Sequence, residues 1–363
     1  MANYFAPVFM VQVNGTSLSA DVSCNVQDIS IVTAPNTLDT FNLTIANTYP
    51  KMRWTHTSDA DLFKAGNSVL ISLGYVDELE ELFDGEITKV SPSFPSSGVP
   101  TLAIEGHTRL HWLQRGKNTR SFQQMTDKQI VEKIAQDNGL EPQVEDPGIS
   151  YDYVMQPNQT DLEFVRTRAA RIHFEVFVQA KTLIFRKMKE ADQETYTLVW
   201  GHTQAGLSAP NTFPLIEFTP TVNARQPTPS TQVRGYDPKA KQSIVAKSGP
   251  SDQNGTMGGS IKGGNVWQKA FQKERAFVRV TTPVQTQAEA DEHAKAIYNN
   301  MAIDTITGNG RTIGLPALRS GRVIKLDGLG PRFNGLYYLD QVTHKLDDGG
   351  YTTSFTVKRN AIS

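Results

Sequence analysis

Short runs in which apolar and polar residues alternate dominate the first third of the chain. Val8 to Val13 alternates and is followed by Asn14-Gly15, a dipeptide that favours a tight hairpin turn. Val26 to Val32 and Phe41 to Ile45 alternate in the same way. A period of two places every second side chain on one face of a sheet. The pattern therefore predicts a β-barrel or β-sandwich over residues 1–117.

The pattern changes to a helical period after residue 118. Three segments begin with a capping box, at Thr126 to Gln129, Thr160 to Glu163 and Thr286 to Glu289, and each is followed by apolar residues at helical spacing. Two alternating runs on either side of Gln179-Ala180-Lys181 follow the second helix and predict a hairpin. Residues 118–205 are therefore predicted to form a small α+β domain.

A strand–turn–strand–strand unit occurs twice, about 250 residues apart. The first copy contains Val69 to Leu73 and Phe83-Asp84-Gly85, and the second contains Val323 to Leu326 and Phe333-Asn334-Gly335. Two copies are too few for a solenoid, which needs at least three stacked repeats. The repeat predicts a duplicated β domain instead.

The predicted fold class is mixed α+β, mainly β, with two related tube-like β-barrels and a small α+β domain between them. The second barrel is expected to be discontinuous, formed by residues 206–247 and 311–363. Residues 248–310 are expected to be an insertion with one helix and a flexible loop, because residues 248–265 are rich in Gly, Ser and Asn.

The net charge, the lack of long apolar runs and the single cysteine argue against several classes of function. The 363 residues carry a formal net charge of -1, which argues against the basic domain or stripe that nucleic-acid binding needs. A signal peptide and an apolar run long enough to span a membrane are both lacking, so we expect folding in the bacterial cytoplasm. Cys24 is the only cysteine, which excludes an internal disulfide.

The search for catalytic chemistry yields weak candidates. An acidic cluster falls between two strands of the first repeat copy, where a solvated turn or an electrostatic contact with a partner is expected; it consists of Asp77, Glu78, Glu80, Glu81 and Asp84. His107 and His111 lack the intervening Glu of the zincin motif, and the Gly-rich loop lacks phosphate-loop spacing. We predict no catalytic residue, no cofactor and no metal site.

The segment Gln159 to Val165, followed by Arg168-Ala169-Ala170-Arg171 and Phe174 to Val178, resembles the phage late control protein D family. These proteins are hubs of contractile tails and are related to the hub half of VgrG. Further matching segments are Tyr4 to Val13 with Asn14-Gly15, Arg53-Trp54-Thr55, Gly74-Tyr75 with Phe83-x-Gly85, and Tyr153-Val154. The resemblance is nearest to the hubs of phage-tail-like extracellular injection particles.

The resemblance implies a structural baseplate hub. Family hubs are homotrimers in which two barrels per chain form a ring of six similar domains. One face receives the hexameric inner tube and the other holds a trimeric spike, and other baseplate proteins, a tape-measure protein or luminal cargo are further partners. The chain stops at Ser363 without a spike region or a lysozyme-like segment, so we expect a separate spike in a phage-tail-like particle.

Loop position suggests three contact surfaces. They are the acidic loop Asp77 to Asp84, the loop with Arg332, Phe333 and Asn334, and the Gly-rich loop with Gly255, Gly258, Gly259 and Lys262. Two alternatives remain open. A tail-associated peptidoglycan hydrolase would use the acidic loop, and a carbohydrate- or receptor-binding β module would need clustered exposed aromatic side chains, whereas the four tryptophans are scattered.

Overall fold

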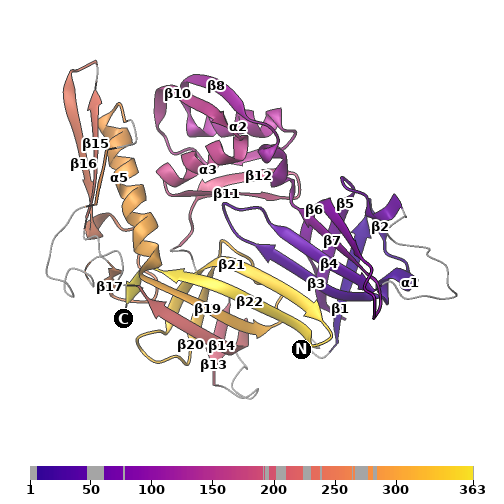
Figure 1. Ribbon diagram of the computed structural model, residues 1–363. Helices are drawn as coiled ribbons and strands as arrows, with labels where there is room; N and C mark the ends of the chain where they lie inside the picture. Colours follow the sequence, from indigo (N-terminus) through magenta and orange to yellow (C-terminus); the bar gives the residue numbers. More distant parts are fainter. Residues whose placement is uncertain are drawn as a thin grey trace.

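The structure is a computed structural model that describes residues 6–46, 61–76, 78–190, 192, 196–201, 210–223, 230–237, 239–263, 265, 277–280 and 284–362. Two β units lie side by side along the base of the molecule (Figure 1). A small α+β unit lies above them, and a helix with a long hairpin forms an arm beside it. The predicted fold class, two related barrels with an α+β unit and an inserted segment, is confirmed.

The first β unit contains six main strands in the sheet order β1-β5-β6-β7-β4-β3, with the short β2 at its outer edge. Their bounds are β1 (Pro7–Val13), β2 (Thr16–Ser17), β3 (Val26–Thr33), β4 (Thr40–Ala46), β5 (Ser68–Tyr75), β6 (Glu78–Ser93) and β7 (Thr101–His107), with α1 (Ala20–Ser23) and η1 (Asp61–Phe63) in the connections. The predicted turn at Asn14-Gly15 is confirmed between β1 and β2. Alternate side chains fill the interior, where Phe41 and Phe83 meet edge to face at 4.9 Å.

The second β unit is a closed barrel of six strands, because its strand order β13-β20-β21-β22-β19-β14 returns to β13. Its strands are β13 (Thr197–Trp200), β14 (Thr212–Val222), β19 (Ile306–Ile313), β20 (Val323–Asp327), β21 (Gly335–Asp347) and β22 (Gly350–Arg359). The interior holds apolar side chains such as Ile324, Tyr337 and Val342. The domain boundary expected at residue 205 would place β13 in the α+β unit. In the structure β13 belongs to the second barrel, because it pairs with both β14 and β20.

The two units have the same strand order, so β1, β5, β6, β7, β4 and β3 correspond to β13, β20, β21, β22, β19 and β14. Irregularities also coincide. The β6–β7 ladder shifts between Ile87 and Lys89, and the β21–β22 ladder shifts between Leu339 and Gln341. The Ile87 N–H donates to Asn67 O at 2.9 Å, and the Leu339 N–H donates to Arg322 O at 2.8 Å. Matching bulges in matching ladders indicate one duplicated unit.

The duplication does not align the two Phe-x-Gly triplets as their letters suggested. Phe83 pairs with Ile71 inside the β5–β6 ladder, whereas Phe333 lies in the turn before β21. The ladder registers instead make Phe83 the counterpart of Gly335, which pairs with Leu326. The connection between β20 and β21 is longer than that between β5 and β6. A matching triplet of residues does not establish equivalent positions in two ladders when the connections before it differ in length.

The α+β unit follows the first barrel. It contains η2 (Arg109–Gln114), β8 (Asn118–Thr126), α2 (Asp127–Asp137), β9 (Glu141–Val144), β10 (Ser150–Gln159), α3 (Asp161–Arg171), β11 (Phe174–Gln179) and β12 (Thr182–Lys187). The two capping boxes predicted in this unit are confirmed, because Thr126 and Thr160 accept from the backbone N–H of Gln129 and Glu163. The predicted hairpin is also confirmed as β11 and β12.

The arm is inserted between β14 and β19. Its elements are β15 (Thr231–Asp237), β16 (Gln242–Ser248), η4 (Pro250–Asp252), β17 (Ile261–Lys262), β18 (Phe277–Arg279), α5 (Gln287–Ala302) and η5 (Ile303–Thr305), and β17 pairs with the C-terminal β23 (Ala361–Ile362). Val233, Ala290 and Ala294 pack together, and this contact holds α5 against the β15–β16 hairpin. The arm therefore has a small core of its own beside the second barrel (Figure 1).

Candidate functional site: the seam between the barrels

A continuous backbone ladder joins the two barrels. Strand β3 of the first barrel pairs antiparallel with the second half of β21, with Thr33 opposite Val342 and Ile29 opposite Leu346. The first half of β21 pairs with β20 of its own barrel. The two barrels consequently form one 13-stranded sheet, and their relative orientation is fixed by backbone hydrogen bonds.

Aromatic side chains reinforce this seam. The Tyr75 hydroxyl donates to Gly314 O at 2.8 Å, and the rings of Tyr75 and Tyr351 lie 5.9 Å apart. The Tyr351 hydroxyl in turn lies 2.8 Å from Nδ1 of His344, which is buried within β21. Buried hydrogen bonds of this kind are costly to break singly, because a lone partner would be left unsatisfied. The seam is therefore a specific contact and not a loose apposition.

The acidic cluster was expected to be a loop, and this expectation is wrong for the described residues. Glu78, Glu80, Glu81 and Asp84 all belong to strand β6, while Asp77 lies outside the described residues. Four of the seven residues from Glu78 to Asp84 are acidic and do not alternate strictly with apolar residues. This hid the strand, because strict alternation is the sequence signal for a half-buried strand. The ladder to β5 continues through the charged segment.

The acidic strand makes contacts within the chain. Arg319 of the second barrel donates to Glu81 O at 2.5 Å and to Leu82 O at 3.2 Å, and it lies 3.6 Å from Glu80 Oε2. Asp84 pairs at 2.7 Å with Arg109, which leads into the α+β unit. The strand lines a cavity of about 490 Å³ where the three units meet. Sequence reasoning missed Arg319 and Arg109 because each is a single basic residue in an ordinary context.

A buried carboxylate connects the α+β unit to the second barrel. Glu175 on β11 is fully buried, accepts from Arg186 Nε at 2.7 Å, and accepts a short hydrogen bond from the Tyr338 hydroxyl on β21. Burial raises the pKa of Glu175, and the bonds from Tyr338 and Arg186 oppose this rise. A buried carboxylate is tolerated where its oxygens are hydrogen-bonded. This contact fixes the α+β unit above the seam.

The Gly-rich segment, expected to be flexible, is tied to the end of the second barrel. Met257 is fully buried, and its N–H donates to Asn360 Oδ1 at 2.9 Å. Lys262 Nζ donates to Pro250 O at 2.6 Å. A Cβ on Gly258 would lie 2.4 Å from the backbone of Leu336, so only glycine allows this approach. The composition predicted mobility, but tertiary hydrogen bonds fix this segment.

Two of the predicted contact surfaces meet around one buried arginine. Arg359 donates to Met257 O at 2.9 Å and to Gly258 O in the Gly-rich segment, and to Asn334 O at 3.0 Å in the β20–β21 connection. Gly255 and Gly259 belong to the same segment, and Arg332 lies over the Phe333 ring at 5.6 Å. Arg359 occupies an inward position of the alternating strand β22. A charged residue at such a position is a sequence signal that could have identified it.

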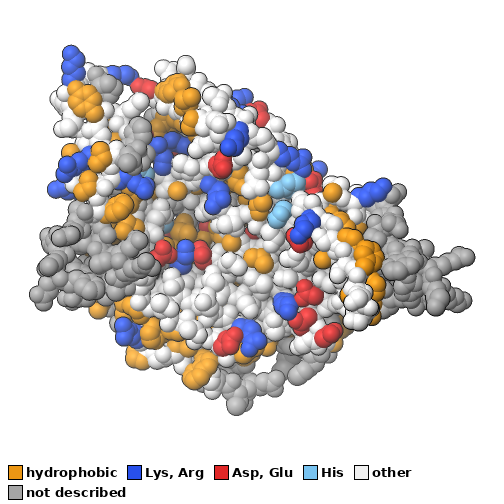
Figure 2. Space-filling model, viewed as in Figure 1, with side chains coloured by type: hydrophobic (Ala, Val, Ile, Leu, Met, Phe, Trp, Pro, Cys, Tyr) orange, Lys and Arg blue, Asp and Glu red, His pale blue; other side chains and the backbone are white. Residues whose placement is uncertain are grey.

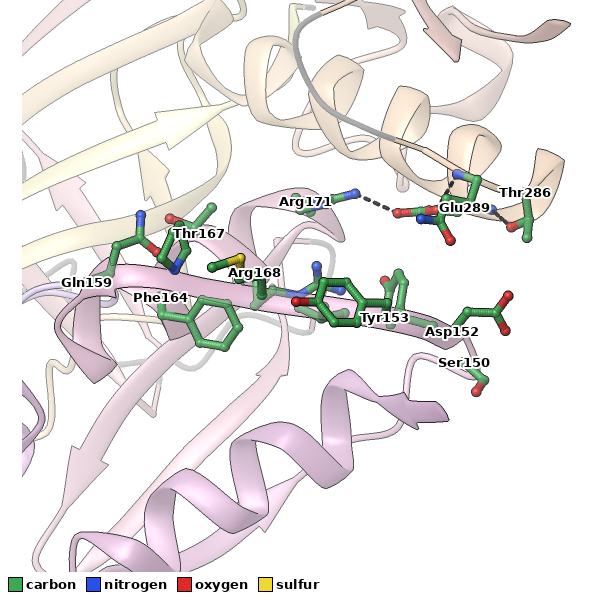
Figure 3. Close-up of a pocket in the computed structure, with 15 residues that line it drawn as sticks. Ser150, Asp152, Tyr153, Gln159, Phe164, Thr167, Arg168, Arg171, Thr286 and Glu289 are labelled. Carbon is green, nitrogen blue, oxygen red and sulfur yellow. Dashed lines mark hydrogen bonds and ion pairs between the residues drawn. The ribbon is translucent and has the colours of Figure 1, made fainter. Parts of the chain in front are cut away.

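A groove separates the α+β unit from the arm. Its volume is about 460 Å³, and its walls are β10, α3 and the start of α5. Figure 3 shows Arg171 of α3 reaching Glu289 of α5, at 2.6 Å, across the groove. Arg168 lies on the α3 side, with Nε 2.5 Å from Asp127 and its guanidinium 4.2 Å from the Tyr151 ring. Paired charges thus hold the arm in place.

The two histidines singled out in the sequence do not form a metal centre with other ligands in the described residues. His111 Nε2 lies 3.0 Å from Glu86 Oε2, which also accepts from Trp112 Nε1 at 2.9 Å. Burial lowers the pKa of His111. Within the described ranges, no group of three His, Cys, Asp or Glu side chains could hold a metal ion.

The surface charge is mixed. Figure 2 shows basic and acidic side chains interspersed over the viewed face, in keeping with the formal net charge of -1. Among the described helices, none is long and apolar enough to cross a membrane.

His344 gives the seam a pH dependence that can be measured. Burial lowers its pKa to about 3, below the value of about 6.5 expected in the unfolded chain. Between these values the unfolded chain binds more protons, so folding stability falls as the pH drops below 6.5. We expect the free energy of unfolding to fall by about 1 kcal/mol between pH 6.5 and 5.5 on account of His344 alone.

Urea unfolding at pH 7.5 and pH 5.5 tests this expectation. The variant His344→Gln should show a smaller loss between the two pH values than the parent chain. His293 keeps part of the dependence, because its pKa is also lowered, to about 4. Equal losses in parent and variant would contradict the assignment.

Comparison with solved structures defines the class of fold. The chain is similar to the 43 kDa tail protein of prophage MuSo2 from Shewanella oneidensis, with a TM-score of 0.71 and 13% identity over 99% of this chain and 100% of that one. It is also similar to the tail protein from Neisseria meningitidis MC58, with a TM-score of 0.67 and 13% identity over 98% and 97% of the two chains. These similarities define a phage-tail-protein fold.

A third similar structure is the E. coli c3393 protein, described as a component of the type VI secretion system. Its TM-score is 0.59 at 13% identity, over 96% of this chain and 76% of that one. The chain belongs to the family described as the Alg8 N-terminal domain, whose model matches residues 6–348. No curated protein matches the sequence.

Proposed function

We propose that the protein is a structural hub of the baseplate of a contractile, phage-tail-like particle. Three copies form a ring in which the first and second barrels alternate, giving six similar units around a central channel. One face of the ring receives the hexameric inner tube, and the other holds a trimeric spike formed by a separate protein. The late control protein D family and its relatives in extracellular injection particles provide the template for this arrangement.

The observation that carries the proposal is the duplication. Both barrels have one strand order and matching bulges, and one backbone ladder joins them. A sixfold partner needs six near-equivalent surfaces, and a threefold assembly supplies them only if each chain carries two. In this proposal one barrel unit contains β1 and β3 to β7, and the other contains β13, β14 and β19 to β22. The second unit thus differs from the predicted residues 206–247 and 311–363, because β13 belongs to it and the β15–β16 hairpin belongs to the arm.

The surroundings of the acidic strand favour this structural role over the hydrolase alternative. Glu80 and Asp84 are paired with Arg319 and Arg109, so they serve contacts between units of the chain. The exposed part of the loop around Arg332 and Phe333 is the surface we assign to tube or spike contact. Neighbouring baseplate proteins, with luminal cargo or a tape-measure protein, are the remaining partners of the assembled ring.

Mass photometry and electron microscopy of the purified chain, alone and with an inner-tube protein of the same particle, test the proposal. We expect a species of three times the 40.1 kDa chain mass, visible as a ring with a central channel. The variant Arg332→Glu should leave that ring intact while weakening its association with tube or spike. A chain that stays monomeric at every concentration, and with the tube protein present, would contradict the proposed function.

A further inference from the structure

The seam inside the chain has an unused counterpart at the two outer edges of the barrel pair. We propose that β14 of one copy pairs antiparallel with the second half of β6 of the next copy, as β3 pairs with β21 within the chain. This inference rests on the proposed function, because it needs copies arranged in a ring. It names the strands and the register of the contact between them.

Strand β14 is the counterpart of β3. β3 pairs with β4 and β14 pairs with β19, and each ladder shifts at the same place, between Val26 and Asp28 and between Leu215 and Glu217. Counting from these bulges, Phe218 corresponds to Ile29 and Val222 corresponds to Thr33. The register of one strand thus transfers to the other without adjustment.

Strand β6 is the counterpart of β21 by the same reasoning. The ladder shifts between Ile87 and Lys89 in β6 and between Leu339 and Gln341 in β21. Val90 therefore corresponds to Val342. Phe94, directly after β6, corresponds to Leu346. Val342 and Leu346 are the first and last residues of β21 that pair with β3.

Both proposed edges are available in the described part of the chain. β13 covers β14 only from Thr212 to Leu215, and β5 covers β6 only from Glu78 to Glu86. On this side, residues 216–222 of β14 and 88–93 of β6 have no ladder partner among the described residues. In β21 the matching edge is the one that β3 fills. An unpaired edge of this length is a template for another strand.

Transferring the register of the internal seam gives definite pairs. Val90 lies opposite Val222, and Phe94 lies opposite Phe218, so apolar side chains meet at both ends. The exposed fraction of Phe94 is 58%, and that of the neighbouring Ile216 is 44%, both high for such large apolar side chains. Ser91 lies opposite Thr221 and Ser93 opposite Thr219, which keeps the middle of the contact polar and uncharged.

Pro92 and Pro220 fall opposite each other in this register. Neither residue has an N–H to donate. The nitrogen of a proline in an edge strand faces away from the strand that is already paired with it, and so faces the open edge. The contact between copies is therefore expected to have fewer backbone hydrogen bonds than the internal seam. Prolines also protect exposed edges from indiscriminate pairing. A weaker ladder suits a contact that forms between chains already folded.

Disulfide trapping tests the register. In a Cys24→Ser background, the variant Ser91→Cys/Thr221→Cys should link copies head to tail, because opposed residues in an antiparallel pair lie within disulfide reach. Val32→Cys/Thr343→Cys is the matched control, because these residues are opposed in the internal seam. The pair Ser91→Cys/Thr219→Cys is displaced by two residues and lies near the limit of disulfide reach.

Mild oxidation of the concentrated chain should convert the matched variant into a closed trimer that migrates at three times the chain mass on a non-reducing gel. We expect about tenfold less of this product from the displaced pair. Formation of the internal control disulfide without the matched intermolecular one would overturn the inference. A threefold ring seen by microscopy in that sample would leave the proposed function standing, whereas an uncrosslinked monomer would contradict both.

Discussion

Replacing Arg359 with methionine is expected to destabilise the second barrel by about 3–5 kcal/mol. The guanidinium is fully buried and donates to the carbonyl oxygens of Met257, Gly258 and Asn334. Methionine fills much of the same volume but donates nothing, so three buried acceptors lose a charged donor. The loss should also release the Gly-rich segment, because two of the three acceptors belong to it.

Urea unfolding gives the stability, and hydrogen exchange of the Met257 and Gly258 amides reports on the segment. Lys358→Met is the matched control, since Lys358 lies on the other face of the same strand and its ion pairs with Asp304 and Asp340 are partly exposed. Partly exposed pairs contribute about 0–1 kcal/mol. Similar losses in the two variants would show that Arg359 has no special role.

The variant Asp127→Ala is expected to lose about 3–5 kcal/mol of folding stability, because it leaves a buried guanidinium without its counter-ion. Asp127 is fully buried, lies 2.5 Å from Arg168 Nε, and accepts from the Tyr151 hydroxyl at 3.0 Å. Arg168 is also nearly fully buried. The α+β unit should therefore unfold at a lower urea concentration than the barrels.

A second substitution tests the cause of this loss. Asp127→Leu/Arg168→Met removes both charges, and it should recover most of the stability, because a buried ion pair is often replaceable by apolar side chains. Asp137→Ala serves as the control, since its pairs with Arg120 and Lys133 are exposed. If the double variant is no more stable than Asp127→Ala, the uncompensated charge is not the reason for the loss.

The seam relates these local contacts to the proposed ring. Arg319, Glu175 and Tyr338 fix the orientation of the three units within one chain, and β3 and β21 set the angle between the barrels. A ring closes only if that angle is held, because a small error repeated around it would open the assembly into a helix. The buried polar contacts at the seam are suited to this purpose.

The local elements and the duplication can be recognised from the amino-acid sequence alone. Capping boxes at Thr126 and Thr160 and the Asn14-Gly15 turn follow from hydrogen bonds within a few residues, so they could be recognised from neighbouring letters alone. The repeated strand pattern indicated two related barrels, because a period of two survives divergence of the individual residues.

Contacts between residues that are distant in the sequence could be identified only from the folded chain. The charged segment Glu78 to Asp84 is a strand because it continues the ladder with β5. Arg319 of the second barrel pairs with Glu80, and Arg109 pairs with Asp84, where the three units meet. The Gly-rich segment is fixed because Arg359 lies beneath it. Such contacts depend on the register of each ladder, which neighbouring residues in the sequence do not specify. A shift of the register by one residue would turn every side chain of a strand to the opposite face of the sheet.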